Sequence, residues 1–471
     1  MTGPHLRETA PDDVPTIPIP HRGPAMLADL QTQPIPVVAC SGRKGRAGEG
    51  LALSISSALG ALAGFAGWLL AARLLPQADV GRAAAVVSAF ILTAGVTQLN
   101  LGLGLLRWLP VAGRHASTLV RRSLMLIMPL SAVAGLGYVV FVPELARTTA
   151  GPSAPLALGT CLFVLACAGW GAFVVHDYVL VGIGRPWWAV WRNGLFAVVR
   201  IALLVALGPA LGAQGIVLSW VAPIVVWIAV GSVVLLVAVR RYARRHPAAG
   251  VAPTRSEVLG FLCPTAAAQI GYTLLLNQVP LIVILRVGPE AGAAFFIAWQ
   301  AAVVLETAAN YYMHSLSVSW ARAPERAAEL TAACRRRLLG TFLPLLALGA
   351  VLAGPGLSFF GTGYTAAADA LRLLLIGLAL RLVVVHELGV RMAAGRAMAY
   401  ARLHLTGTLL VLGVVALVPL PADPVPDGLG AALLPVALGH VAVQAACAVH
   451  VAVVQVRRRS AQTGTTSTAA P

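Results

Sequence analysis

Residues 213–245 read AQGIVLSWVAPIVVWIAVGSVVLLVAVRRYARR. No charged residue interrupts the run before Arg240, and a cluster of arginines ends it. A helix crosses the hydrocarbon core of a bilayer when about 20 consecutive residues are predominantly apolar. This stretch therefore predicts a membrane-spanning helix that ends in a basic segment at one membrane face.

The same pattern recurs along the chain and sets its class. Of the 471 residues, 58% are hydrophobic and 11% are charged, and the mean hydropathy is +0.83. Soluble domains carry about 25% charged residues, so this composition predicts an all-α integral membrane protein. About twelve transmembrane helices are expected, at the apolar stretches near residues 50–72, 83–106, 122–142, 155–180, 187–208, 213–238, 258–285, 291–313, 337–354, 365–389, 398–419 and 430–455.

The distribution of basic residues predicts the orientation. With the N-terminus inside, 27 of the 34 Lys and Arg residues fall in cytoplasmic segments, and only four fall in outer loops, namely Arg73, Arg82, Arg147 and Arg286. Cytoplasmic loops carry the excess of Lys and Arg, so both termini are expected in the cytoplasm. The formal charge of +17 is explained by these loops and by contact with anionic lipids. No continuous basic face or basic-aromatic motif points to nucleic acid.

The pattern divides the chain into five segments. Residues 1–46 are rich in Pro, Gly and polar residues without periodicity and predict a disordered cytoplasmic tail. A six-helix lobe over 47–238 and a second over 258–456 flank a basic cytoplasmic linker at 239–257. A second disordered tail is expected at 457–471. The protein is predicted to be a multi-pass protein of the cell membrane.

The two lobes share a motif at an outer helix junction. In each lobe an arginine is followed by proline, an acid and glycine in the same order, as Arg73, Pro76, Asp79 and Gly81, and as Arg286, Pro289, Glu290 and Gly292. Proline and glycine also mark ordinary turns, but the shared order favours an internal repeat. Six helices per repeat predict a pseudo-two-fold axis along the membrane normal, a common plan in transporters.

Catalytic and metal-binding motifs are absent from the sequence. It contains no P-loop, no zinc-protease or nucleophile-elbow motif, and no paired cysteines beside histidines. Gly102 and Gly104 lie in an apolar helix without a preceding strand, so they predict close helix contact rather than dinucleotide binding. We expect no enzymatic activity, no cofactor and no metal.

Charged residues at membrane depth are the candidates for function. A charge at the centre of a spanning helix costs about 2.5–3.5 kcal/mol on insertion scales, so such residues tend to face a protein interior or a wet cavity. Arg200, Arg381 and Glu306 are predicted to line a cavity that binds substrate. Arg372 is a further candidate, with a structural role equally compatible with its position. Glu306 either pairs with one of these arginines or binds a coupling ion.

Other polar residues in the spans favour structural roles. Asp177, His386 and Glu387 lie near helix ends, where an internal ion pair or a side chain reaching the interface is expected. The amides predict interhelical hydrogen bonds; they are Asn100, Asn193, Asn277, Gln278 and Asn310. Three tryptophans at 187, 188 and 191 predict an interfacial belt, with a sugar-stacking platform as the alternative.

The motif positions carry a resemblance to a known family. The run from Trp68 through Arg73, Pro76 and Gly81, followed by Leu101-Gly102-Leu-Gly104 and Arg107-Trp108-Leu109-Pro110, resembles the opening two helices of a transporter branch. This is the polysaccharide-transport, O-antigen-flippase-like branch of the multidrug/oligosaccharidyl-lipid/polysaccharide exporter superfamily. Trp108 stands where the family commonly has phenylalanine. Residues 279–296, with Pro289 and Gly292, are similar to the same family. The specific match covers about a quarter of the chain.

The resemblance implies a flippase that moves lipid-linked saccharides across the membrane by alternating access. Its expected partners are membrane lipids, a polyprenyl-pyrophosphate-linked saccharide, and glycosyltransferases and a polymerase of the same pathway. Intramembrane arginines suit such a substrate because the planar guanidinium binds pyrophosphate oxygens bidentately.

Two other functions remain open. An ion-coupled multidrug exporter of the same superfamily would favour a cavity acid and aromatic residues over several arginines. A membrane polysaccharide polymerase or glycosyltransferase usually presents a long outer loop with catalytic residues, and the longest outer loop expected here has only about a dozen residues.

The charge distribution makes a direct topology prediction. Single cysteines placed at Thr148 or Val425, in an otherwise cysteine-free chain, should react with an impermeant thiol reagent in intact cells. Cysteines at Ala243 or Glu325 should react only after the membrane is permeabilised, because their loops carry the excess of arginine. Labelling of position 243 from outside would contradict the predicted helix count.

Overall fold

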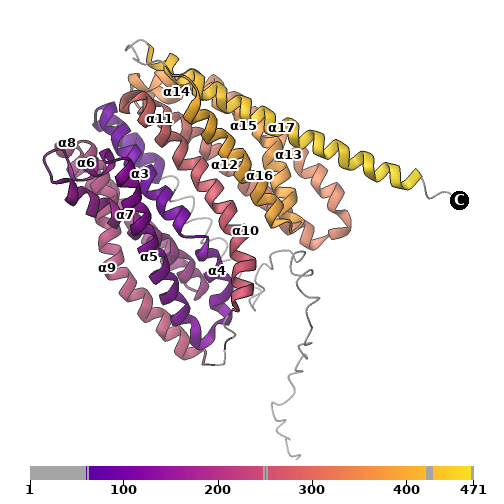
Figure 1. Ribbon diagram of the computed structural model, residues 1–471, viewed down its shortest axis with the longest axis horizontal. Coiled ribbons are helices and arrows are strands. Elements are labelled where there is room, and N and C mark those ends of the chain that lie inside the picture. Colours follow the sequence, from indigo (N-terminus) through magenta and orange to yellow (C-terminus); the bar gives the residue numbers. More distant parts are fainter. Residues whose placement is uncertain (1–59, 61–62, 248–249, 251–252, 421–427, 468–471) are drawn as a thin grey trace, which may run out of the picture.

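The computed structural model describes residues 60, 63–247, 250, 253–420 and 428–467. Their regular elements are helices, and no strand occurs among them. Figure 1 shows two bundles side by side, one from the first half of the chain (indigo to magenta) and one from the second half (orange to yellow), with α10 between them. The predicted tail at 1–46 lies outside the described residues.

The first bundle contains the helices up to the linker. They are Ala63–Leu74, α3 (Gln77–Thr97), α4 (Leu101–Trp108), α5 (Ala116–Phe141), the short α6 (Glu144–Ala150), α7 (Leu156–Gly182), α8 (Pro186–Leu211) and α9 (Ala213–Arg245). Proline supplies the first residue of α8, where its missing N–H removes no hydrogen bond. Gly212, with a φ of 57°, makes the tight turn into α9.

The second bundle follows. Its helices are α10 (Arg255–Thr273), the π-turn Leu274–Gln278, α11 (Val279–Val287), α12 (Pro289–Arg322), α13 (Ala327–Val351), the short α14 (Ala353–Ser358), α15 (Ala368–Ala393), α16 (Ala397–Leu417) and α17 (Leu429–Ser467). A capping box starts α10, in which Thr254 and Glu257 satisfy each other's backbone N–H groups. α17 continues to Ser467 and so enters the segment 457–471 that the sequence predicted as a disordered tail.

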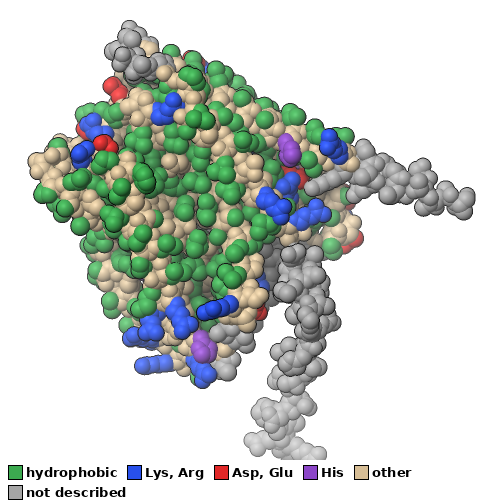
Figure 2. All heavy atoms as spheres, in the orientation of Figure 1, with side chains coloured by type: hydrophobic (Ala, Val, Ile, Leu, Met, Phe, Trp, Pro, Cys, Tyr) green, Lys and Arg blue, Asp and Glu red, His purple; other side chains and the backbone are tan. Residues whose placement is uncertain are grey.

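Ten helices in the described part of the chain are long and apolar enough to cross a membrane. The two other predicted spans also correspond to helices. The first is described only as Ala63–Leu74, and the ninth is α13, whose first turns carry Arg335, Arg336 and Arg337. On the face shown in Figure 2, hydrophobic side chains cover the middle of the bundles, while Lys and Arg gather toward their ends. Exposed apolar residues such as Val140 and Leu417 fit a lipid-facing surface.

The prediction of one continuous helix for the second span was wrong. The sequence indicated one helix over 83–106, but α3 starts at Gln77 and breaks at Leu99 and Asn100, which both have positive φ. Asparagine tolerates this left-handed conformation better than most residues. Its side-chain Nδ2 donates to the carbonyl of Thr265 on α10, at 3.3 Å. Hydropathy does not reveal the break because both flanking segments are apolar.

The structure extends the internal repeat beyond the two Pro-Gly junctions. Gly184 and Gly395, both with positive φ, end the helices α7 and α15. In each turn the next residue closes the same hydrogen bond, from Arg185 N to Leu180 O and from Arg396 N to Arg391 O, both at 2.8 Å. Gly151 and Gly361 likewise follow the short helices α6 and α14 with positive φ. These turns recur in the same order in both lobes, which supports the predicted internal repeat.

The two Pro-Gly junctions meet where the lobes touch. Gln77 Nε2 donates to the backbone carbonyl of Glu290 at 2.8 Å, and Arg73 Nε donates to that of Phe359 at 2.6 Å. Gly81 on α3 is buried directly against the carbonyl of Pro289, the first residue of α12. Close backbone approach requires glycine there, because any β-carbon would overlap the carbonyl oxygen.

This contact predicts a difference between two helical glycines. Gly81→Ala should destabilise the folded protein by about 1–3 kcal/mol, the usual cost of overpacking. Gly137→Ala, on α5, has nothing within 4 Å of its new β-carbon and should be neutral or slightly stabilising. Thermal unfolding of both variants in the same detergent checks this, and equal melting temperatures would show that the lobes do not pack this closely.

Candidate functional site

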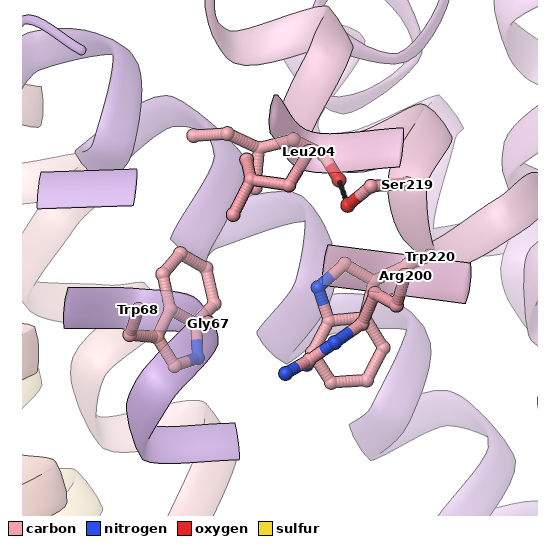
Figure 3. A pocket seen from close by; sticks show the side chains of 7 residues that line it. Gly67, Trp68, Arg200, Leu204, Ser219 and Trp220 are labelled. Carbon is pink, nitrogen blue, oxygen red and sulfur yellow. Dashed lines mark hydrogen bonds between the residues drawn. The ribbon is translucent and has the colours of Figure 1, made fainter. Parts of the chain in front are cut away.

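Arg200 lies inside the first lobe, in the middle of α8. Its side chain forms one wall of a small pocket with Gly67, Trp68, Ser219 and Trp220, contributed by the helix Ala63–Leu74 and by α9 (Figure 3). The guanidinium lies 4.3 Å from the ring centroid of Trp220 and donates to the carbonyl of Ala63. Gly67 is needed at this point, because a β-carbon there would overlap the guanidinium.

The charge of Arg200 lacks a carboxylate partner among the described residues. The residue is 5% exposed, and no described Asp or Glu oxygen lies within 4.0 Å of its guanidinium. The other buried arginines form ion pairs with carboxylates. The cation–π contact with Trp220 offsets part of the cost of burial, but it leaves the positive charge available to an anion.

Aromatic rings surround the Trp220 side of this pocket. Trp170 lies 5.7 Å, Phe90 6.0 Å and Phe196 6.1 Å from the Trp220 centroid, and Phe173 stacks on Trp170 at 5.4 Å. Such edge-to-face and stacked pairs stabilise a packed interior. The interior of the first lobe is therefore aromatic, with one cation without a described carboxylate.

The interior of the second lobe is ionic. Arg381 on α15 donates from Nε to Glu306 Oε1 on α12 at 2.6 Å, and both residues are buried. Arg381 Nη1 also contacts Gln444 Oε1 on α17 at 3.4 Å. Of the two roles predicted for Glu306, the pairing with an arginine is the one present in this structure.

Further polar groups of the second lobe converge on this pair. His404 on α16 and His440 on α17 are each 5% exposed, and both rings lie within the electrostatic reach of Arg381. Tyr272 and Tyr400 stack on His404, with centroid distances of 6.3 and 6.0 Å. The sequence analysis did not single out His404, His440 or Gln444, although a polar residue in mid-span was the signal that could have found them.

The remaining charged candidates have local partners. Arg372 is exposed at the start of α15 and pairs with Asp369 one turn away. Asp177 pairs with Arg192 at 2.8 Å, and Glu387 pairs with Arg391 at 2.9 Å, as the expected structural role requires. Arg192, counted by sequence among the cytoplasmic charges, is 3% exposed within α8. Arg192 contacts α7 through an ion pair with Asp177 and a hydrogen bond that it donates to the carbonyl of Phe173.

The amide candidates divide into two groups. Asn100 and Gln278 bond across the lobes, the latter accepting from Tyr138 of α5, and Asn193 donates to Asp177 of α7 at 3.0 Å. Asn277, in contrast, donates to Thr273 one turn earlier in its own segment. Its predicted interhelical bond is thus replaced by one that supports the π-turn, because that turn leaves backbone carbonyls available.

The glycines and the arginine of the family motif lie at helix contacts. Gly102 faces the ring of Tyr178 on α7, and Gly104 faces Trp108 and Leu262, as predicted for close packing. Arg107 lies 5.0 Å from the ring centroid of Phe261 on α10. Gly292 packs against Ile284 of α11, so that α11 and α12 form a tight hairpin at the Pro289 junction.

Comparison with solved structures identifies the architecture. An inward-facing multidrug resistance MATE family transporter of the MOP superfamily matches with a TM-score of 0.58 at 16% identity, over 88% of this chain and 99% of that chain. An outward-facing MATE transporter matches with 0.52 at 15% identity, over 87% and 94%. The chain has the MATE-type transporter fold. It is a multi-pass integral membrane protein by this fold and by its apolar helices.

A third match bears on the binding pocket. It is a MOP superfamily transporter from Pyrococcus furiosus, with a TM-score of 0.52, 16% identity, and coverage of 87% of this chain and 94% of that chain. Its description reports reverse polarity of the binding pocket and suggests a different function for that protein. No protein-family model and no curated protein sequence matches the chain. The chain shares the fold of these transporters, and the polysaccharide branch stays a prediction.

The Arg381–Glu306 pair predicts non-additive mutations. Removing one partner leaves the other charge buried, which costs about 3–5 kcal/mol. Arg381→Gln or Glu306→Gln alone should therefore lower the melting temperature more than the double variant does. Arg372→Gln, which breaks an exposed pair, should cost at most about 1 kcal/mol. Additive effects of the two buried substitutions would contradict a direct pair.

Proposed function

We propose that this protein is an alternating-access transporter of the cell membrane that moves lipid-linked saccharides, with their anionic head passing through the interior of the protein. The two-lobed fold shared with MATE transporters supports transport rather than catalysis. The observation that carries the choice of substrate is Arg200, a buried cation without a described carboxylate partner.

The environment of Arg200 suits an anionic head group. A guanidinium binds phosphate or carboxylate oxygens bidentately and stays charged when buried. Its present hydrogen-bond acceptor is a neutral backbone carbonyl, which an anion would readily replace. The pocket leaves a cavity of about 10 Å³, room for about one water molecule, so an anionic group enters it only when the walls of the pocket move apart.

An anionic head group that crosses the membrane needs a cationic site inside the protein. Moving an anionic saccharide head through hydrocarbon leaves its charges and hydroxyl groups without partners, which is prohibitive. A cationic site inside the protein replaces lost hydration, while the long apolar tail of the carrier remains in lipid. The neutral pairing of Arg381 with Glu306 makes that pair less suited to a permanent anion site than Arg200.

A multidrug exporter is the second candidate function. The aromatic interior around Trp170, Phe196 and Trp220, together with the buried acid Glu306, favours apolar or cationic drugs. The two functions make opposite demands on Arg200, because a cationic drug is repelled by it and an anionic head is attracted.

Replacement of Arg200 tests the proposal. Arg200→Gln should reduce saccharide export about tenfold or more, since a hydrogen bond to a charged group contributes about 1.5–3 kcal/mol. Lipid-linked precursor should accumulate on the cytoplasmic side, and Arg200→Lys should rescue export only in part. The measurement is precursor and surface saccharide in a host that depends on this chain, at matched protein levels.

The control is Arg372→Gln, which removes an exposed arginine of the second lobe and should leave export unchanged. Normal saccharide export by Arg200→Gln would reject the anionic-head assignment. A gain of resistance to cationic drugs in that variant would favour the multidrug function instead.

A further inference from the structure

Exposed arginines gather at one end of the first lobe. Some lie at the start of α5 and in the turn before it, and the others lie in the last turns of α9; they are Arg114, Arg121, Arg122, Arg240, Arg241, Arg244 and Arg245. The two groups are neighbours, because Ala116 and Val120 of α5 share a buried cluster with Leu235 and Val239 of α9. Figure 2 shows Lys and Arg side chains gathered at the lower end of this lobe, below a hydrophobic flank. We call these arginines the basic patch.

No described carboxylate neutralises the basic patch. None of the ion pairs among the described residues includes one of its arginines. The described acids of the first lobe are Asp79, Glu144 and Asp177, and each of them pairs with an arginine outside the patch. The patch therefore carries a positive charge that is open to an anion from outside the chain.

The basic patch continues the lipid-facing surfaces of α5 and α9. On α9 the exposed valines recur every three or four residues, which places them on one face of the helix. They are Val226, Val230, Val233 and Val237. Arg240 and Arg244 extend this face with the same spacing. On α5, Arg122 lies one turn before the exposed Leu126, and Val133 continues that face. Lipid chains that cover these faces therefore end beside the guanidinium groups.

Tryptophans mark the depth of the basic patch in the bilayer. Gly212 joins α8 to α9 as a hairpin, so α8 begins beside the end of α9. Trp187, Trp188 and Trp191 are exposed in the first turns of α8, and the guanidinium of Arg185 lies 4.3 Å from the ring centroid of Trp188. Tryptophan is enriched at the level of the lipid head groups. The arginines at the end of α9 thus lie at the level of lipid phosphates.

We propose that the basic patch binds the phosphate groups of anionic phospholipids, whose acyl chains lie along the exposed faces of α5 and α9. A guanidinium binds phosphate oxygens bidentately. A lipid contacts the arginines and the apolar faces together, whereas a soluble acidic partner would contact only the arginines. The bound lipid is not the transported molecule, so the proposal goes beyond the proposed function and does not depend on it.

The second lobe provides a matched comparison. Arg335, Arg336 and Arg337 are exposed on α13, the helix that takes the place of α5 in the internal repeat. However, α13 packs on α12 and α15 rather than on α17, the helix in the place of α9. These arginines therefore supply the same charge from a single helix, without a second basic helix end beside it.

Lipid binding to the purified full chain tests the proposal. Native mass spectrometry in detergent measures the affinity for phosphatidylglycerol and for phosphatidylcholine, whose choline cancels the phosphate charge. The parent protein should bind phosphatidylglycerol more tightly. Arg122→Gln/Arg240→Gln/Arg244→Gln should bind it about 100-fold more weakly, since each arginine beside anionic lipid contributes about a fivefold factor in affinity.

The control is Arg335→Gln/Arg336→Gln/Arg337→Gln, which removes the same charge from the second lobe and should retain tight binding. Elution from a sizing column and circular dichroism confirm that both variants are folded. A readout on the parent protein needs no substitution. Phosphatidylglycerol with a photoreactive group in its acyl chain should crosslink to residues 122–140 of α5 and 226–244 of α9.

The contrary results are distinct. Equal weakening in both glutamine variants would show that total charge attracts the lipid, and it would overturn the proposal. Equal affinity of the parent for the two lipids, or crosslinks that avoid α5 and α9, would do the same. Tighter binding of soluble polyglutamate than of phosphatidylglycerol would assign the basic patch to an acidic protein instead.

Discussion

A charge inside a membrane protein needs a partner, and this requirement organises the interior of both lobes. A charge at mid-membrane is costly on every insertion scale. Arg192 meets the requirement through Asp177, and Arg381 through Glu306. Each pair joins different helices, so the electrostatic need also fixes helix against helix. Arg200 departs from the pattern, because its described partners are a carbonyl and an indole ring. A buried residue that departs from this pairing, as Arg200 does, is a natural candidate for a functional role.

The lobes share one architecture and differ in chemistry. Equivalent turns at Gly184 and Gly395 close with the same backbone hydrogen bond. The first lobe nevertheless encloses aromatic rings around Arg200, together with the Arg192–Asp177 pair, while the second encloses the Arg381–Glu306 pair beside His404 and His440. A repeat of this kind lets one scaffold hold two different sites. The backbone hydrogen bonds that close its turns do not depend on which side chains lie in the interior.

Contact between the lobes depends on small residues and on backbone carbonyls. Gly81 allows α3 to approach Pro289, and the carbonyls of Glu290 and Phe359 accept hydrogen bonds from the first lobe. These directional contacts lie within a broad apolar interface, in which α3 packs on α12 and the Trp68 ring meets the Phe296 ring edge-on.

The sequence alone was sufficient for the class of the protein and for the position of most of its helices. Apolar segments long enough to span a bilayer predict membrane-spanning helices, because a soluble protein could not bury so many of them. The Pro-Gly junctions indicated the internal repeat. The sequence also located Arg200, Arg381 and Glu306, because a charged residue inside a long apolar segment can be recognised from the sequence.

Only the tertiary structure decided which of these charges are neutralised. Glu306 meets Arg381 from a distant part of the chain, His404 and His440 join them from two further helices, and Arg200 meets a tryptophan instead of an acid. Pairing of this kind depends on which helix faces point toward one another, and hydropathy along a chain does not encode the rotation of one helix against another.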